Sequence, residues 1–129
     1  MRDWSEADLF KYLKENHYPD LVKSDNPMSR WDCYSAIANH RIELKCRKKH
    51  YDDLMIEEKK YRAMLEHCKG TFEIPMYINS TPEGVYRFNL KQFRPRWQVK
   101  KLPKTTHFSE TSRISKRVSF LKVTKAEKI

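Results

Sequence analysis

The sequence predicts an α/β (α+β) fold, in which a mixed central β-sheet is flanked by helices. Three observations lead to this prediction. Apolar residues recur at helical spacing near the N-terminus and again over residues 52–69, and apolar and polar residues alternate over residues 30–47 as in a β-hairpin. Two further strand-like runs follow, so the expected order is helix, strand, strand, helix, strand, strand, with a basic C-terminal extension.

Length and composition limit the kind of protein. The chain has 129 residues, which predicts one domain over residues 1–129, with a core in residues 1–91 and an extension in residues 92–129 that packs on it. Two glycines in the whole chain exclude a P-loop and a dinucleotide-binding fingerprint. No apolar run is long enough to cross a membrane, the start lacks a signal-peptide core, and the three cysteines form no CxxC pair. We therefore expect a cytoplasmic protein with reduced cysteines, in the host cytoplasm if it is viral.

The first helix is expected to begin after Ser5, whose side chain can cap the first turn. Three apolar residues then lie on one helix face and should pack inward: Leu9, Phe10 and Leu13. Glu6 begins the same inward-facing stripe, which is an unusual place for a solvated carboxylate. This position makes Glu6 a candidate for a functional site.

A loop and a hairpin follow the first helix. Residues 20–29 are rich in turn formers and predict the loop. Two strands are expected over residues 30–37 and 41–47, and the short break between them predicts the hairpin. The period of two along a strand puts Glu43 and Lys45 on one face of the second strand, opposite its apolar residues.

A second helix is expected over residues 52–69, and Gly70 is its left-handed stop. The apolar stripe of this helix consists of Leu54, Tyr61, Leu65 and Cys68. Residues 72–79 predict a buried strand, and residues 85–90 predict another after a turn. The remaining tail is polar and basic, with one strand-like run over residues 118–123.

Positive charge is concentrated in the C-terminal part of the chain. The formal net charge is +10, and residues 71–129 hold thirteen Lys or Arg against four Asp or Glu, a net +9. Such an excess favours a polyanionic partner, most commonly nucleic acid, although a merely soluble basic surface has the same composition. Eight basic residues are candidates for contacts with nucleic acid: Arg47, Lys48, Lys49, Arg94, Arg96, Lys100, Lys101 and Lys104.

Two acidic residues and a lysine form the candidate chemical site. Asp32 lies on the first strand of the hairpin and Glu43-Leu44-Lys45 on the second, so the polar side chains can converge near one end. Carboxylate oxygens are the ligands that Mg²⁺ or Mn²⁺ prefers, and the Leu44 carbonyl could join them. Such an ion could activate water toward a phosphate, while Lys45 positions that water or stabilises the charge on the phosphate. Because a Glu-x-Lys triplet is common by chance, the prediction rests on the acid eleven residues earlier and on the apolar strand around the triplet.

This arrangement resembles the PD-(D/E)xK nuclease superfamily, and the order of its elements is similar to Holliday-junction-resolvase-like and small phage-type nucleases. The resemblance covers the chain except its C-terminal third. It implies a restriction-endonuclease-like core and an Mg²⁺- or Mn²⁺-dependent endonuclease that hydrolyses DNA, branched or structured DNA included, as a homodimer. By this resemblance Asp32 and Glu43 hold the metal, and Glu6 supports the metal site. Lys45 then matches the catalytic lysine, and Lys60 matches the polar residue of the following helix.

The same residues have plainer explanations. The two hairpin acids could pair across the strands with a neighbouring cation, which would be Arg30, Arg41 or Lys45. Glu6 could simply interact with the helix dipole, and Lys60 could be an exposed helix cation. Two other functions are open at this point: a non-catalytic nucleic-acid-binding module that uses the basic C-terminal surface, and an interaction protein whose basic tail docks on an acidic partner.

Overall fold

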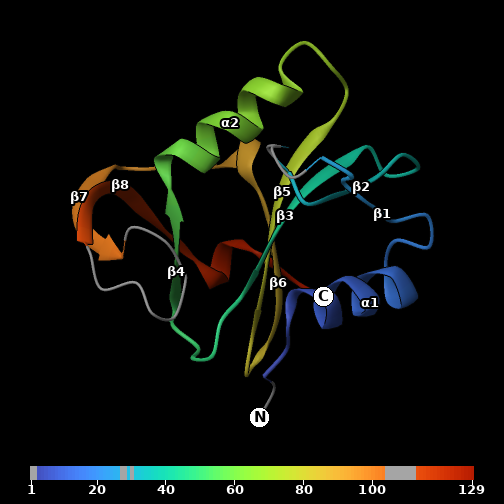
Figure 1. Cartoon of the computed structure of the whole chain (residues 1–129), viewed down its shortest axis with the longest axis horizontal. Helices are drawn as coiled ribbons and strands as arrows, with labels where there is room; N and C mark the ends of the chain where they lie inside the picture. The colour runs from blue at the N-terminus through green and yellow to red at the C-terminus, as the bar shows by residue number, and fades with distance from the viewer. Residues whose placement is uncertain (1–2, 27–28, 30, 104–112) are drawn as a thin grey trace.

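The computed structural model describes residues 3–26, 29, 31–103 and 113–129, and this part of the chain forms two β-sheets and two α-helices (Figure 1). The larger sheet has the strand order β1-β2-β3-β5-β6-β9, and the smaller sheet has the order β4-β8-β7. In chain order the elements are α1 (Glu6–Asn16), β1 (Val22–Lys23), β2 (Cys33–Ser35), β3 (His40–Cys46), β4 (Asp53–Glu57), α2 (Glu58–Cys68), β5 (Ile74–Thr81), β6 (Gly84–Asn89), β7 (Gln98–Pro103), β8 (Arg113–Lys122) and β9 (Glu127–Lys128).

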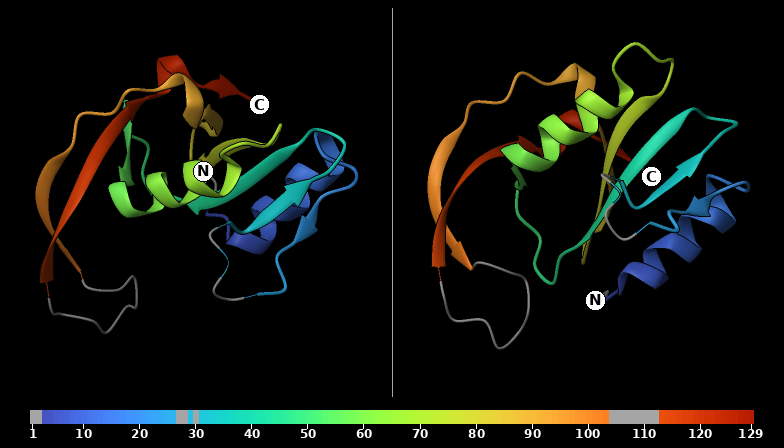
Figure 2. Two further views of the ribbon diagram at one scale, coloured as in Figure 1. Left: turned by 90° about the horizontal axis from the view of Figure 1, so that it is seen from above. Right: turned by 45° about the horizontal axis from the view of Figure 1, so that its top comes forward.

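The larger sheet is mixed, because β3 and β5 run parallel while its other strand pairs are antiparallel. Parallel strands need a long crossover connection, and the chain between β3 and β5 supplies β4 and α2. α1 covers one face of the larger sheet, while α2 and the smaller sheet lie on the other side (Figures 1 and 2). The predicted fold class, a mixed central sheet flanked by helices, is confirmed.

α1 begins and packs as the sequence predicts. The Ser5 hydroxyl accepts a hydrogen bond from the Asp8 N–H at 3.2 Å, and the Asp8 carboxylate accepts one from the Ser5 N–H at 2.9 Å. This capping box satisfies two backbone donors at the helix start. Leu9 and Leu13 are fully buried in the core beneath the helix.

Among the described residues, no helix is long and apolar enough to cross a membrane.

β3 divides its side chains between the two faces of the larger sheet. Ile42 and Leu44 pack in a first core with α1. Because side chains alternate along a strand, Glu43 and Lys45 point to the opposite side. A second core joins that side of the sheet to α2, β4 and β8, and its buried residues are Leu54, Ile56, Tyr61, Met64, Tyr77, Tyr86, Phe88, Leu90 and Leu121.

The prediction of a helix over residues 52–69 is wrong at its N-terminal end. Residues Asp53–Glu57 form β4, and α2 begins only at Glu58. Leu54 and Ile56 are buried with the period of two of a strand, because β4 pairs with β8 from the far end of the chain. The end of the helix is as predicted, since Gly70 follows it with a positive φ of 74°.

Other element boundaries also differ from the prediction. The loop expected over residues 20–29 contains β1, which pairs with β2, and β2 is shorter than the strand expected over residues 30–37. Residue 30 lies outside the described residues. β5 and β6 match the next two predicted strands to within two residues at each end. The C-terminal extension holds much more strand than the run expected over residues 118–123, because β7 pairs with β8, β8 pairs with β4, and β9 extends the larger sheet beside β6.

Leu121 tests whether the C-terminal extension and the N-terminal core unfold as one unit. Its side chain is buried in the second core, so Leu121→Ala should lower the free energy of unfolding by about 2–5 kcal/mol. Urea unfolding followed by circular dichroism and by tryptophan fluorescence should still give one coincident transition. Val99→Ala, at an exposed position of β7, is the control and should change the stability by less than about 0.5 kcal/mol. Two separate transitions would contradict a single domain over residues 1–129.

Candidate active site

One pocket brings together the side chains that the sequence singles out. It has a volume of about 320 Å³ and is lined by residues of α1, β3, β4, α2 and β5. All five side chains predicted to be catalytic line it: Glu6, Asp32, Glu43, Lys45 and Lys60. The other lining residues are Leu44, Cys46, Arg47, Met55, Ile56, Glu57 and Tyr77. We call this cavity the central pocket.

Asp32 is held at the point where β2 begins. Its backbone N–H donates to the Ile42 carbonyl at 2.8 Å, and its carboxylate Oδ2 accepts a hydrogen bond from the Leu44 N–H at 2.7 Å. The N–H and C=O of one residue point to the same edge of an extended strand. The Leu44 carbonyl therefore lies on the same edge of β3 as Asp32, beyond the first residue pair that β2 forms with β3.

Lys60 of α2 contacts the second acid directly. Its Nζ donates to Glu43 Oε2 at 2.6 Å. The side chain of Lys60 is half exposed, whereas Glu43 is only 8% exposed. Lys60 is thus not a plain exposed helix cation, because it is the partner of a buried carboxylate. This contact depends on α2 following β4 directly, since that places the first turn of the helix over β3.

Burial and the nearby Asp32 carboxylate disfavour the charged form of Glu43. Burial, and then the negative charge of Asp32, raise the pKa of Glu43 to about 7, even though the hydrogen bond and charge of Lys60 oppose this shift. Burial and the charge of Asp32 also raise the pKa of Glu6, against the opposing charges of Lys23 and Lys60. Burial and the Asp32 charge thus outweigh the lysines in setting the pKa of both Glu43 and Glu6.

Lys45 lies two residues beyond Glu43 on the same face of β3. Burial lowers the pKa of its ammonium group, and the positive charges of Arg47 and Lys60 add to that effect, while Glu57 and Glu43 oppose it. For Lys60, burial lowers the pKa but the bond to Glu43 and the nearby acids outweigh it, so the net pKa is raised. The two lysines are therefore not equivalent, because Lys60 is committed to Glu43 and Lys45 faces the space of the pocket.

Arg47 has internal partners that the sequence did not reveal. Its guanidinium donates to Asn79 Oδ1 at 2.8 Å, to the Met55 carbonyl at 2.6 Å and to the Tyr77 hydroxyl at 3.1 Å. The Tyr77 hydroxyl also donates to the Met55 carbonyl at 3.0 Å. These bonds join β3, β4 and β5 at the wall of the central pocket. The sequence does contain one indication of this cluster, because the polar residue Asn79 ends a run that predicts a buried apolar strand. In the structure Asn79 is fully buried.

The residues present fit an ion such as Mg²⁺ or Mn²⁺. The available donors are oxygens, namely the carboxylates of Asp32 and Glu43 and the Leu44 carbonyl, and hard ions prefer such donors. Over the described part of the chain, no group of three or more His, Cys, Asp or Glu side chains could hold a metal. Water would therefore complete the coordination shell, as is usual for Mg²⁺. The raised pKa of Glu43 agrees with this fit, because a cation beside the two acids would relieve their repulsion.

The structure also bears on the plainer explanation of the hairpin acids. Arg41 forms an ion pair with Glu73, and its guanidinium stacks on the rings of Trp31 and Tyr34 at 4.5 and 4.3 Å from their centres. Its charge is therefore engaged away from Asp32 and Glu43. Arg30 lies outside the described residues.

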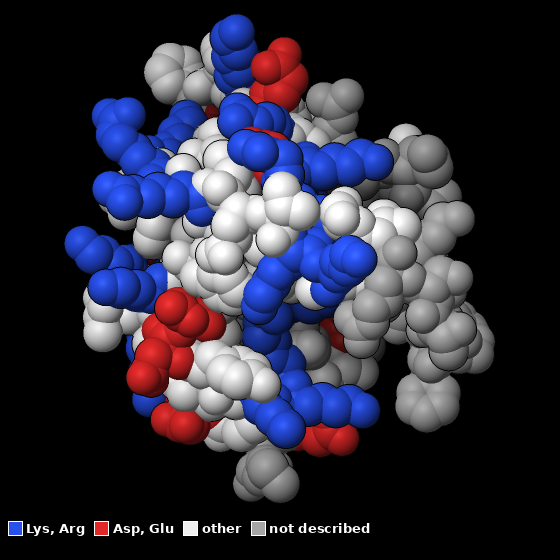
Figure 3. Space-filling model, turned by 90° about the vertical axis from the view of Figure 1, so that its left-hand side faces the viewer, with Lys and Arg blue, Asp and Glu red and all other residues white. Residues whose placement is uncertain are grey.

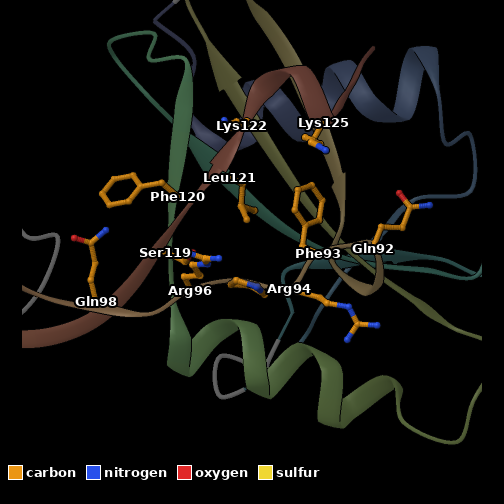
Figure 4. Close-up of a pocket in the computed structure, with 11 residues that line it drawn as sticks. Gln92, Phe93, Arg94, Arg96, Gln98, Ser119, Phe120, Leu121, Lys122 and Lys125 are labelled. Carbon is orange, nitrogen blue, oxygen red and sulfur yellow. The ribbon is translucent and has the colours of Figure 1, made fainter.

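The predicted nucleic-acid contacts are spread over several surfaces. Arg94 and Arg96 line a second pocket of about 530 Å³ together with Lys122 and Lys125, and none of the described residues that line it is acidic (Figure 4). Lys100 and Lys101 lie on β7, Lys48 and Lys49 lie between β3 and β4, and Lys104 is outside the described residues. Lys and Arg side chains are numerous on the face of the molecule shown in Figure 3.

Comparison with known proteins shows a likeness in fold. No family model matches the chain, and no curated protein matches its sequence. The structure is similar to that of Hjc, a Holliday junction resolvase from the archaeal hyperthermophile Archaeoglobus fulgidus, with a TM-score of 0.59 and 12% sequence identity. The match covers 96% of this chain and 88% of that protein. It therefore includes most of the C-terminal third, which the sequence resemblance left out.

The buried charge of Glu43 makes the stability of the metal-free protein depend on pH. An acid whose pKa rises on folding, here from 4.5 to about 7, keeps its proton in the native state over a range where the unfolded chain has lost it. Stability should therefore fall as pH rises through that range and then level off. Glu43→Gln should remove this loss and be more stable than the parent protein at pH 8 by about 1–3 kcal/mol, since one pKa unit corresponds to about 1.4 kcal/mol.

Urea unfolding in EDTA, measured from pH 4.5 to 8, checks this expectation. Glu66→Gln, at an exposed position of α2, is the matched control and should keep the pH dependence of the parent protein. A Glu43→Gln variant with the same pH profile as the parent protein would show that the Glu43 carboxylate is solvated in solution.

Proposed function

We propose that this chain is a metal-dependent endonuclease that hydrolyses DNA phosphodiester bonds, with branched or structured DNA as its substrate. The observation that carries the proposal is the convergence of Asp32, Glu43 and Lys45 in one pocket, with Lys60 bonded to Glu43. The likeness in fold to an archaeal Holliday junction resolvase supports both the reaction and the branched substrate.

Asp32, Glu43 and the Leu44 carbonyl would hold Mg²⁺ or Mn²⁺. Such an ion, when bound, lowers the pKa of water and offsets the negative charge that builds on a phosphate. Lys60 orients the Glu43 carboxylate by binding Oε2, which leaves Oε1 for the metal. Glu6, which lines the same pocket, would support the site at its rim.

Lys45 is the residue placed to act on the phosphate. Its ammonium would hydrogen-bond the attacking water or a non-bridging phosphate oxygen, and so stabilise the charge that develops during hydrolysis. For Arg47, which the sequence suggested as a phosphate contact, the hydrogen bonds favour a structural role. Because its guanidinium is bonded to β4 and β5, Arg47 would hold the wall of the pocket in place behind Lys45.

Basic residues from several parts of the chain would bind the DNA backbone. Lys48 and Lys49 follow β3 and the site directly, and the remaining candidates are Arg94, Arg96, Lys100, Lys101 and Lys104. Backbone contacts position DNA without reading its sequence, so they suit a substrate recognised by its shape. A homodimer would place two such sites on one branched molecule and allow both strands to be cut.

The purified protein should cleave DNA only when a divalent metal is present. We expect nicking of plasmid and four-way-junction DNA with Mg²⁺ or Mn²⁺ and none in EDTA. Glu43→Ala and Lys45→Ala should each lower the cleavage rate by on the order of 10²-fold or more, because each removes a group that stabilises the transition state. Gel assays on linear, nicked and four-way substrates with a series of metals measure this.

Glu66→Ala, on the exposed side of α2, is the matched control and should cleave like the parent protein. Equal cleavage by all three variants would indicate a contaminating nuclease or a different site. Salt-dependent DNA binding without cleavage under any metal would favour a non-catalytic nucleic-acid-binding module.

The predicted backbone contacts should appear in the salt dependence of binding. Each phosphate contact releases about one counterion from the DNA when the protein binds. Replacing both Arg94 and Arg96 with Ala should therefore make the plot of log binding constant against log salt concentration less steep by about 1–2. Lys11→Ala, at an exposed position of α1, is the control and should leave the slope unchanged. Fluorescence anisotropy with labelled junction DNA in EDTA provides the measurement, and an unchanged slope in the double variant would exclude these two residues from the interface.

A further inference from the structure

A third cavity, distinct from the pocket lined by Arg94 and Arg96, shares part of its wall with the central pocket. It has a volume of about 400 Å³ and shares two lining residues, Arg47 and Met55, with the central pocket. Its other lining residues are Tyr51, Asp53, Leu54, Lys100 and Phe120. A volume of this size is within the range of about 300–1,000 Å³ that is common for small-molecule sites. We call this cavity the adjacent pocket.

The register of the smaller sheet places three residues of the adjacent pocket on one face. Met55 of β4 lies opposite Phe120 of β8, and Lys116 of β8 lies opposite Lys100 of β7. Since opposite residues share a face and side chains alternate along each strand, Met55, Phe120 and Lys100 all lie on one face of this sheet. Figure 4 shows Phe120 pointing away from its neighbour Leu121, which belongs to the second core. Since Met55 lines both pockets, this face of the smaller sheet borders both of them.

Two aromatic side chains in the adjacent pocket are not needed for either core. Tyr51 is 57% exposed, and neither its ring nor that of Phe120 belongs to the first or second core. The Lys100 ammonium lies 5.0 Å from the centre of the Phe120 ring. Aromatic rings combined with nearby cations are the usual means by which proteins bind unpaired nucleotides, since every base can stack on an aromatic side chain.

Asp53 distinguishes a base from a phosphate as the occupant. Its carboxylate lines the same cavity and would repel a phosphate, but it can accept a hydrogen bond from a base amino group, as acids do with cytosine. The phosphates of a bound strand would instead lie toward Lys100 at the edge of the cavity. The composition of the adjacent pocket thus suits a nucleobase with its backbone outside.

We propose that the adjacent pocket binds an unpaired base of the DNA strand whose backbone passes the central pocket, with the base stacked on Tyr51 and Phe120. This inference rests on the proposed nuclease function and specifies its substrate. The preferred DNA has at least one unpaired nucleotide next to the bond that is cut, as in a bulge or at the open centre of a branch point. An intact duplex offers no such base without the cost of unpairing it.

A fluorescent base tests binding separately from cleavage. A duplex with 2-aminopurine in a one-nucleotide bulge is titrated with the protein in EDTA, and stacking on the aromatic rings should quench its fluorescence. Tyr51→Phe should keep the quenching, whereas Tyr51→Leu and Phe120→Leu should each lose most of it. Phe72→Leu is the matched control, because Phe72 is 93% exposed and lines neither pocket. Thermal unfolding of each variant checks that the fold is retained.

The second readout is the ratio of kcat/KM on bulged DNA to that on intact duplex, with Mg²⁺ present. Tyr51→Leu and Phe120→Leu should lower this ratio by about 10-fold, in line with the stacking contribution of one base. The adjacent-pocket proposal is overturned if both leucine variants keep the quenching, or if neither variant changes the ratio of kcat/KM. Metal-dependent cleavage by the same protein would still support the proposed nuclease function. Quenching that both leucine variants lose, in a protein that cleaves no DNA with any metal, upholds the nucleotide site and overturns the proposed nuclease function.

Discussion

The alternation of side chains along β3 is the constraint on which the candidate site depends. Ile42 and Leu44 are buried in the core under α1, so Glu43 and Lys45 have to face α2 and β4. Parallel pairing with β5 over seven residue pairs fixes the position of the strand. A shift of one residue would exchange the two faces and put both charged side chains into the apolar core. The packing that stabilises the fold therefore also determines which residues meet at the pocket.

The charge of Glu43 explains the arrangement of the groups around it. A buried carboxylate is costly unless it is paired and hydrogen-bonded, and Lys60 meets only part of that requirement because Asp32 lies nearby. The Leu44 N–H satisfies one oxygen of Asp32, which keeps that second acid in place despite the repulsion. Arg47 strengthens the wall without neutralising the acids, since its bonds go to neutral partners. The protein thus keeps two carboxylates together in one pocket where the proposed function needs a cation.

The site was more predictable from the sequence than the sheet topology was. Asp32, Glu43 and Lys45 follow from the period of two within one hairpin, whereas Lys60 is a candidate only through the resemblance to PD-(D/E)xK nucleases. Local spacing predicts a helix where β4 lies, because the partner of β4 is β8 from the far end of the chain and local spacing gives no information on that pairing. The hydrogen bonds of Arg47 could not be predicted either, because its partners lie on β4 and β5, and local spacing does not show which strands come together.

The outermost strands of the larger sheet, β1 and β9, are two residues long each. β9 is further fixed to β6 by the ion pair between Glu127 and Arg87 at 3.1 Å. Long open strand edges are where protein chains tend to join into aggregates, and very short outer strands give an incoming chain few backbone groups to pair with. The short edge strands β1 and β9 therefore reduce edge-to-edge pairing between the larger sheets of two molecules.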